Sequence, residues 1–304
     1  MIDRRSVVLA VAASTMFATV GTANAADWKS KYPELVFAVI PSENASSVND
    51  RYGPMVEYLG KQLGVKVTLR IAADYAAVIE GQRAGQIHIG HYGPSAFARA
   101  LMIGAKVEAV AQEVNADGTK GYYSVLWVKK DNPATKVQDL KGKNLCLVDP
   151  NSTSGNNVPR FAMDKMGIDP DKFFGKVAYA GSHENAIIGV QQGTCDAAFN
   201  WYNDENESLL MRMDRKGMAK FADFKMIFKS DQIVNSPIAV LGDMPTELKM
   251  AIKDALLGVA KNDPKAFEKA TDGKQKPYEA VDNKAYDAVI ELNKFVDQLK
   301  KKSS

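Results

Sequence analysis

The sequence DPNSTSGNNV, residues 149–158, joins a predicted strand to a predicted helix and carries three consecutive hydroxyl side chains. The apolar run at 144–148 indicates a buried strand, and residues 159–166 have the pattern of a helix. At a helix start the first backbone N–H groups lack an intrahelical partner and the dipole is positive, which favours an oxyanion. One hydroxyl is enough to cap a helix. The run Ser152, Thr153 and Ser154 therefore indicates an anion-binding turn in addition to a cap.

The rest of the chain alternates short apolar strands with amphipathic helices. Strands are predicted at 35–40, 65–71, 87–90, 107–114, 122–129, 144–148, 176–180, 196–201 and 238–241. Helices are predicted at 52–63, 75–84, 94–101 and 159–166, and the C-terminal third is mostly helical. Strands that alternate with helices predict an α/β fold with mainly parallel sheets.

Two breaks in this alternation divide the chain. The first lies near residues 129–133 and the second near residues 235–237, where polar residues and a proline interrupt the pattern. We expect residues 26–129 and 236–304 to form one lobe and residues 130–235 to form the other.

The first 25 residues have the features of a secretory signal. Arg4 and Arg5 precede an apolar core at 7–20, and the small residues Ala23 and Ala25 flank Asn24 before a cleavage point. The apolar core contains hydroxyl residues and is shorter than a membrane-spanning helix requires. We therefore expect export, and a periplasmic location where the cell has two membranes.

Composition excludes several classes of partner. The 304 residues carry 39 Lys and Arg against 36 Asp and Glu, a net charge of +3, and no basic stripe that would indicate nucleic-acid binding. The two cysteines, Cys146 and Cys195, are too few for a disulfide framework. Export leaves two alternatives open, one disulfide between them or two buried thiols.

Catalytic and metal-binding signatures are missing from the sequence. It contains no G-x-S-x-G elbow, no phosphate-binding loop of the Walker type and no H-E-x-x-H motif. His88 and His91 lie at a strand end where their side chains face opposite ways, so a shared metal site is not expected. An exported hydrolase with a scattered triad remains an alternative.

Polar segments follow six of the predicted strands, where open α/β sheets collect their ligands. Besides the hydroxyl run they contain Tyr75, Tyr92, His183, Asp204 and Glu205. Each also has a purely structural interpretation: the tyrosines could pack, the histidine could cap a helix, and the acids could be solvated. Together, an acidic pair opposite a hydroxyl turn would suit a zwitterion with phosphonate and ammonium groups.

These segments resemble the periplasmic phosphonate-binding proteins of ABC importers, a family with phosphite- and phosphate-binding relatives. The resemblance covers essentially the whole mature chain and is carried by four segments, 74–76, 91–93, 149–155 and 181–184. It implies a two-lobed periplasmic binding protein fold of type II with a two-strand hinge. It also implies a monomer without cofactor or metal that delivers a small phosphonate to a membrane permease.

The resemblance also assigns roles to residues. Ser152, Thr153 and Ser154 would hold the phosphonate oxygens, with His183 and Tyr92 as further donors and Tyr75 closing the other side. In aminoethylphosphonate-binding members, carboxylates hold the ammonium group, and one of them falls in the segment 203–205, which contains Asp204 and Glu205. The other precedes a proline, where this chain has Ser236. The expected ligand is therefore 2-aminoethylphosphonate, with phosphite, phosphate or an uncharged alkylphosphonate as alternatives.

Overall fold

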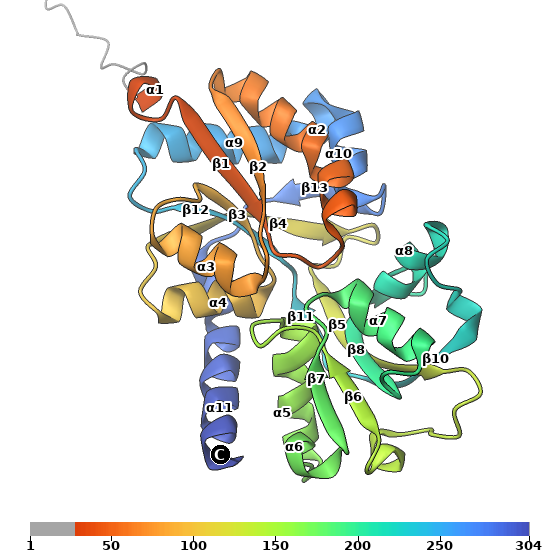
Figure 1. Ribbon diagram of the computed structural model, residues 1–304. Coiled ribbons are helices and arrows are strands. Elements are labelled where there is room, and N and C mark those ends of the chain that lie inside the picture. The colour runs from red at the N-terminus through yellow and green to blue at the C-terminus, as the bar shows by residue number, and fades with distance from the viewer. Residues whose placement is uncertain (1–27, 304) are drawn as a thin grey trace, which may run out of the picture.

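The structure is a computed structural model that describes residues 28–303, folded into two α/β lobes (Figure 1). The predicted signal segment, residues 1–25, lies outside the described residues. Within residues 28–303, no helix combines the length and the apolar character needed to cross a membrane.

Lobe 1 is built on a six-stranded sheet. Its strand order is β13-β4-β12-β3-β1-β2. The strands are β1 (Glu34–Val39), β2 (Lys66–Ile71), β3 (Ile89–His91), β4 (Val107–Asn115), β12 (Pro237–Leu241) and β13 (Gln275–Glu279). The helices are α1 (Trp28–Lys31), α2 (Ala45–Leu63), α3 (Tyr75–Arg83), α4 (Pro94–Met102), α9 (Thr246–Asn262) and α10 (Pro264–Thr271).

Helices cover both faces of this sheet because successive side chains of a strand point in opposite directions. From β1, Leu35 and Phe37 pack with α2 and α9, whereas Ala38 packs with α3 and α4 on the other face. Helix α2 begins at the cap Asn44, whose side chain accepts a hydrogen bond from the Ser47 N–H, and ends before Gly64. Lobe 1 thus has an apolar layer on each side of its sheet.

Lobe 2 is built on a seven-stranded sheet. Its main order is β10-β5-β8-β6-β7, with β11 paired to β5 and β9 paired to β8. The strands are β5 (Gly121–Lys129), β6 (Asn144–Leu147), β7 (Lys176–Tyr179), β8 (Ala197–Asp204), β9 (Glu207–Ser208), β10 (Phe224–Lys229) and β11 (Ile233–Val234). The helices are α5 (Val158–Lys165), α6 (Pro170–Phe173), α7 (His183–Gln192) and α8 (Leu209–Arg215).

The predicted α/β class is correct, but the sheets are mixed and not mainly parallel. In lobe 1, β1 pairs in parallel with β2 and β3, whereas β12 and β13 run antiparallel to their neighbours. In lobe 2, β6 pairs in parallel with β7 and β8, whereas β5 runs antiparallel to β8 and β10. Strands β5 and β12 enter their sheets directly from the other lobe, without the crossover helix that parallel pairing requires.

The first crossing between the lobes lies earlier than the sequence suggested. Strand β5 belongs to the sheet of lobe 2, so the chain crosses at residues 116–120 and not after residue 129. Asp117-Gly118 in this segment is typical of a hairpin turn, which is why β4 and β5 read as neighbours in one lobe. The chain returns to lobe 1 between Val234, the end of β11, and Pro237, the start of β12.

The C-terminal helix α11 (Asp287–Ser303) contacts both lobes, although we expected it in lobe 1 alone. Arg99 of α4 pairs with Asp297 at 2.7 Å, and Phe161 of α5 packs edge-on against Phe295. The buried Asn293 donates to the Ser95 carbonyl of lobe 1. Figure 1 shows α11 descending from lobe 1 alongside α5. This helix is a third connection between the lobes.

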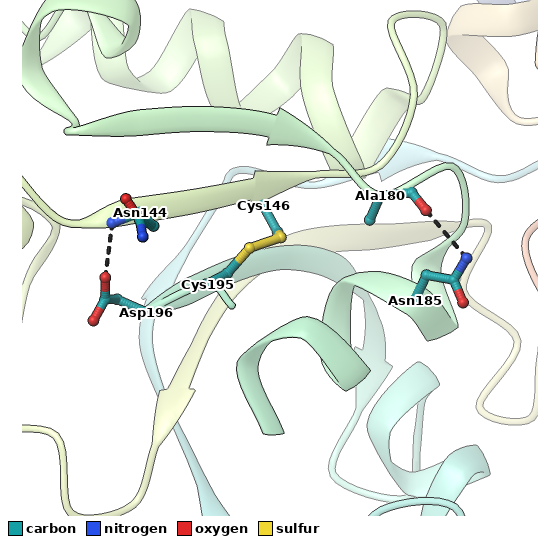
Figure 2. Close-up of a disulfide and its surroundings, with 6 residues drawn as sticks. All are labelled: Asn144, Cys146, Ala180, Asn185, Cys195 and Asp196. Atoms are coloured by element: carbon teal, nitrogen blue, oxygen red, sulfur yellow. Dashed lines mark hydrogen bonds between the residues drawn. A yellow bond between two sulfur atoms is a disulfide. The ribbon is translucent and has the colours of Figure 1, made fainter. Parts of the chain in front are cut away.

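A disulfide joins Cys146 of β6 to Cys195, just before β8 (Figure 2). The two Cα atoms are 5.7 Å apart, within the usual range for such a bond. A Cβ atom at Gly189 of α7 would lie 3.2 Å from the Cys146 sulfur, so the helix packs tightly over the disulfide. Of the two alternatives left open by the sequence, the structure has the disulfide.

Reducing this disulfide should lower the stability of the protein. It closes a loop of 49 residues in the unfolded chain, a constraint worth roughly 2–4 kcal/mol. Urea unfolding with and without a phosphine reductant should therefore show a lower free energy of unfolding when reduced. The double variant Cys146→Ala/Cys195→Ala is the control and should not respond to reductant. Equal stability of the wild type in both conditions would contradict the expectation.

Candidate functional site

A small cavity lies between the lobes, at the edge of both sheets. Its volume is about 100 Å³, well below the 300–1,000 Å³ typical of sites for drug-sized ligands. Residues from α3, β3 and β4 form the lobe 1 side, and residues from β5, β8 and the turn after β6 form the lobe 2 side. The cavity is therefore complete only when the lobes are together.

The turn predicted to bind an anion lies in the wall of this cavity. Ser152, Thr153 and Ser154 all line it, and the Ser152 side chain caps the helix by accepting a hydrogen bond from Gly155 N–H at 3.1 Å. The turn is a π-helical segment, Thr153–Asn157, that continues into α5. The N–H groups at the start of a helix have no intrahelical partner and are directed away from the helix. The turn thus combines hydroxyl and backbone donors at one point.

Gly155 allows this turn to lie close to strand β6. A Cβ atom at this position would lie 2.4 Å from Val148 Cγ2 and 2.8 Å from Ser152 Oγ. Both distances are far below van der Waals contact, so any other residue would displace the turn. The glycine in the Ser-Thr-Ser-Gly run is required by this close approach.

Two tyrosines bring hydroxyl groups to the turn. Tyr75, the first residue of α3, is buried, and its hydroxyl lies beside Ser152 without a well-aligned hydrogen bond in the described chain. Tyr122 of β5 lies beside Thr153 and Ser154. Burial raises the pKa of both tyrosines, although the neighbouring hydroxyls oppose this shift, so both remain proton donors. Sequence reasoning found Tyr75 and missed Tyr122.

His183 lies at the first position of α7, next to the turn. Its Nε2 is 3.4 Å from Ser152 Oγ, and its Nδ1 is 2.7 Å from Asn200 Oδ1. Because Asn200 offers its oxygen, Nδ1 carries the proton and the ring is held in one tautomer. Burial lowers the pKa of His183 to about 4, so the ring is neutral near pH 7.

Three of the predicted site residues do not direct their polar groups into the cavity. The Tyr92 ring lines the cavity region, but its hydroxyl donates to Gln82 Oε1 at 2.6 Å and is directed into lobe 1. Asp204 and Glu205 do not line the cavity. Asp204 accepts hydrogen bonds from the N–H groups of two following residues, and Glu205 is exposed. Six of the eight predicted residues are thus gathered at one cavity, and the acidic pair is not.

A buried cluster of charges connects the lobes beside the cavity. Glu43 of lobe 1 pairs with Arg51 of its own lobe, with Arg212 of lobe 2 at 2.8 Å and with Lys216 at 2.7 Å. Burial opposes ionisation of Glu43, but the three cations outweigh it and hold its pKa far below its usual range. Asp272 of lobe 1 adds a contact to Arg215 at 2.8 Å. The pairs that Arg212, Arg215 and Lys216 make with Glu43 and Asp272 form only when the lobes meet.

The two-lobed fold and its inter-lobe cavity define a periplasmic binding protein of type II. A binding protein component of an ABC phosphonate transporter from Pseudomonas aeruginosa has the same fold, with a TM-score of 0.78, 27% identity and coverage of 88% of each chain. A Prochlorococcus marinus protein crystallised with methylphosphonate is similar in fold, with a TM-score of 0.76, 21% identity and coverage of 87% and 98%.

The sequence comparison is more specific than the fold. The family model described as "ABC transporter, phosphonate, periplasmic substrate-binding protein" matches residues 37–286, and the chain belongs to this family. It is 31% identical to the phosphonates-binding periplasmic protein of Escherichia coli over 84% of this chain and 75% of that one. It is 32% identical to the phosphate-import protein PhnD of Mycolicibacterium smegmatis over 68% of this chain. The matched region covers 66% of that relative's length, slightly less than two thirds.

Acid should destabilise the protein through His183. In the unfolded chain the His183 ring takes up a proton near pH 6.5, whereas in the folded protein its pKa is about 4. The contribution of the neutral ring is complete above pH 6.5 and is lost as the pH falls from 6.5 towards 4, by roughly 2–3 kcal/mol. His183→Gln should therefore lose less unfolding free energy than the wild type between pH 7 and pH 4.5. Identical acid profiles would show that the histidine is not responsible.

Removing one inter-lobe ion pair should weaken ligand binding, although neither residue of the pair lines the cavity. Lys216→Met deletes the contact to Glu43, which is worth about 1 kcal/mol for a partly exposed lysine. Dissociation constants from calorimetry should rise about fivefold. Lys220→Met, a nearby exposed lysine, is the control and should bind as the wild type does. No change in the Lys216 variant would mean that this pair does not stabilise closure.

Proposed function

We propose that this protein captures a small phosphonate outside the cytoplasm and delivers it to an ABC import permease. The segment 1–25 would direct its export. The preferred ligand in this proposal is 2-aminoethylphosphonate, and the alternative is phosphite or phosphate held by the same turn. Binding involves no bond making or breaking.

The observation that carries the proposal is the hydroxyl turn in the cavity wall. Ser152, Thr153 and Ser154 line the cavity beside the tyrosine hydroxyls of Tyr75 and Tyr122. Together with backbone N–H groups of the helix start they form a group of neutral donors suited to a tetrahedral oxyanion. A phosphonate has three such oxygens on one atom, and these side chains all line one cavity.

The closure of the lobes supports a transport role. Thr153 of lobe 2 accepts a hydrogen bond from the Ser95 N–H of lobe 1 at 2.8 Å, and His183 N–H donates to the Ser42 carbonyl at 3.1 Å. The ligand site and the inter-lobe contacts therefore share residues. A ligand that touches both lobes favours the closed state, because only that state offers it every contact.

The choice among ligands rests on the cavity and not on the relatives. One relative is named for phosphonates and the other for phosphate, and both groups would fit a hydroxyl turn. The small volume of the cavity favours a ligand of few atoms. Its lining contains one carboxylate, that of Glu113, and two guanidinium groups, those of Arg51 and Arg212.

Calorimetry with four ligands tests the proposal directly. The set is 2-aminoethylphosphonate, methylphosphonate, phosphite and phosphate, titrated into the mature protein near neutral pH. At least one phosphonate should bind with a dissociation constant below about 100 μM, or roughly −5.5 kcal/mol. Absence of binding by all four at that level would refute the proposal, and binding of phosphate or phosphite alone would favour the alternative.

The double variant Ser152→Ala/Thr153→Ala should weaken every ligand that the wild type binds. Each lost hydrogen bond to a charged group costs about 1.5–3 kcal/mol, so the loss should be at least 100-fold. Ser182→Ala is the matched control, because Ser182 also caps a helix of lobe 2 but does not line the cavity. Thermal unfolding without ligand separates lost binding from lost folding. Unchanged affinity in the double variant would place the anion elsewhere.

A further inference from the structure

The C-terminal helix α11 places a buried amide, that of Asn293, between the two lobes. The Asn293 side chain donates from Nδ2 to the Ser95 carbonyl of lobe 1 at 2.8 Å. At its Oδ1 it accepts a hydrogen bond from Asn157 Nδ2 of lobe 2 at 2.9 Å. None of these three residues lines the cavity. One side chain of α11 therefore joins the lobes outside the ligand site, next to the segment that carries the hydroxyl turn.

Helix α11 is fixed to α4 of lobe 1 at two points. Asp297 accepts two hydrogen bonds from the Arg99 guanidinium, each 2.7 Å long, a paired geometry that is stronger than a single contact. Asn293 and Asp297 lie one turn apart on α11. Their partners Ser95 and Arg99 also lie one turn apart, on α4, so the two contacts follow one another along the same pair of helices. Asn293 thus belongs with lobe 1 and offers its oxygen to lobe 2.

The segment Thr153–Asn157 is held against lobe 1 at both of its ends. At its start, Thr153 Oγ1 accepts a hydrogen bond from the Ser95 N–H at 2.8 Å. At its end, Asn157 donates to Asn293. The N–H of Ser95 therefore contacts the segment directly, and the carbonyl of Ser95 contacts it through Asn293. Because Thr153 and the next residue line the cavity, these contacts set where the hydroxyl donors lie relative to lobe 1.

Backbone carbonyls at both ends of this network fix the direction of every hydrogen bond in it. Asn156 Nδ2 donates to the Pro150 carbonyl at 2.9 Å and to Asn157 Oδ1 at 2.7 Å. Since Asn157 uses its oxygen there, only its NH₂ group is left for Asn293. The Ser95 carbonyl can only accept, so it requires the NH₂ group of Asn293. No amide in the series can turn over without leaving a buried group unpaired.

Burial makes these hydrogen bonds matter most in the closed protein. Ser95, Asn157 and Asn293 each keep at most 2% of their surface exposed when the lobes are together. A buried polar group without a partner is unfavourable, whereas water can pair with the same group once the lobes separate. An apolar side chain at position 293 would therefore disfavour the closed state more than the open one.

We propose that Asn293 is a positioning residue for ligand binding, which fixes the hydroxyl turn against lobe 1 in the closed state and so slows the release of a bound anion that it does not contact. This role rests on the proposed capture of a small phosphonate or related oxyanion. Asn293 acts on the turn that would hold the tetrahedral group. Its effect is therefore the same for every ligand of this class, whatever else the ligand carries.

The first test compares Asn293→Leu with Gln298→Leu, the same kind of change at an exposed position of α11. Release of 2-aminoethylphosphonate, methylphosphonate, phosphite and phosphate is followed by stopped-flow fluorescence, with Trp201 of the cavity lining as the reporter. Asn293→Leu should release every ligand that the wild type binds at least about tenfold faster, because two buried groups lose their partner. Association should change by less than about threefold, since the Asn293 contact forms on closure. Gln298→Leu should match the wild type.

The variants Asn157→Leu and Asn157→Leu/Asn293→Leu test whether Asn293 acts through Asn157. Replacing both members of a buried pair by apolar groups leaves neither member unpaired. The double variant should therefore release ligand no faster than the faster of the two single variants, whereas independent sites would multiply their effects. Urea unfolding without ligand separates a folding defect from a binding defect. Asn293→Ala removes the amide without adding bulk and replaces the leucine variant if that one is unstable; it should release ligand at least about threefold faster.

Three results would overturn the positioning role while leaving phosphonate binding in place. They are a wild-type release rate in the Asn293 variants, a change confined to association, and multiplied effects in the double variant. A different result, absence of wild-type binding to all four ligands, would refute the proposed function, and the role of Asn293 would fail with it.

Discussion

The buried carboxylate of Glu43 is the contact on which the arrangement of the two lobes depends. It lies beside Arg51 in lobe 1 and reaches Arg212 and Lys216 in lobe 2. Separating the lobes would remove the contacts of Glu43 with Arg212 and Lys216, which is unfavourable for groups that are largely removed from water. The cavity exists only while they are together, because its walls come from both lobes. Affinity at the cavity therefore includes the free energy of assembling this cluster, although Glu43 itself does not line the cavity.

The two lobes contribute different chemical groups to the lining of the cavity. On the lobe 2 side, hydroxyl donors, backbone donors and the neutral ring of His183 lie in the same lining as the guanidinium of Arg212, which is paired with Glu43 and Glu207. Neutral donors hold an oxyanion while still allowing its release, which a transport protein requires. On the lobe 1 side, the lining contains the carboxylate of Glu113 and the guanidinium of Arg51. The neutral donors of the hydroxyl turn would fit any small tetrahedral anion.

Local patterns in the sequence were enough to place most helices and strands, since apolar periodicity depends on near neighbours. They could not give strand direction, because β5 and β12 enter their sheets from the other lobe and not through a crossover helix. The rule that ligands lie beyond strand carboxyl ends found Tyr75, Ser152 and His183. It missed Tyr122, because β5 runs antiparallel and its beginning lies at the ligand edge. It also led to Asp204, which follows a strand but accepts hydrogen bonds within its local turn, whereas Glu113, which lines the cavity, lies within a predicted strand.

The double crossing of the chain sets an order in which the molecule can be completed. Lobe 2 is one continuous stretch, from β5 to β11, and its disulfide lies entirely within it. In lobe 1, β12 lies between β3 and β4, so β4 cannot join the sheet until residue 241 has emerged. Chains are delivered from the N-terminus, and continuous units fold first. Lobe 2 contains all the strands of its own sheet and both of its cysteines in one continuous stretch, whereas the sheet of lobe 1 needs strands from both ends of the chain.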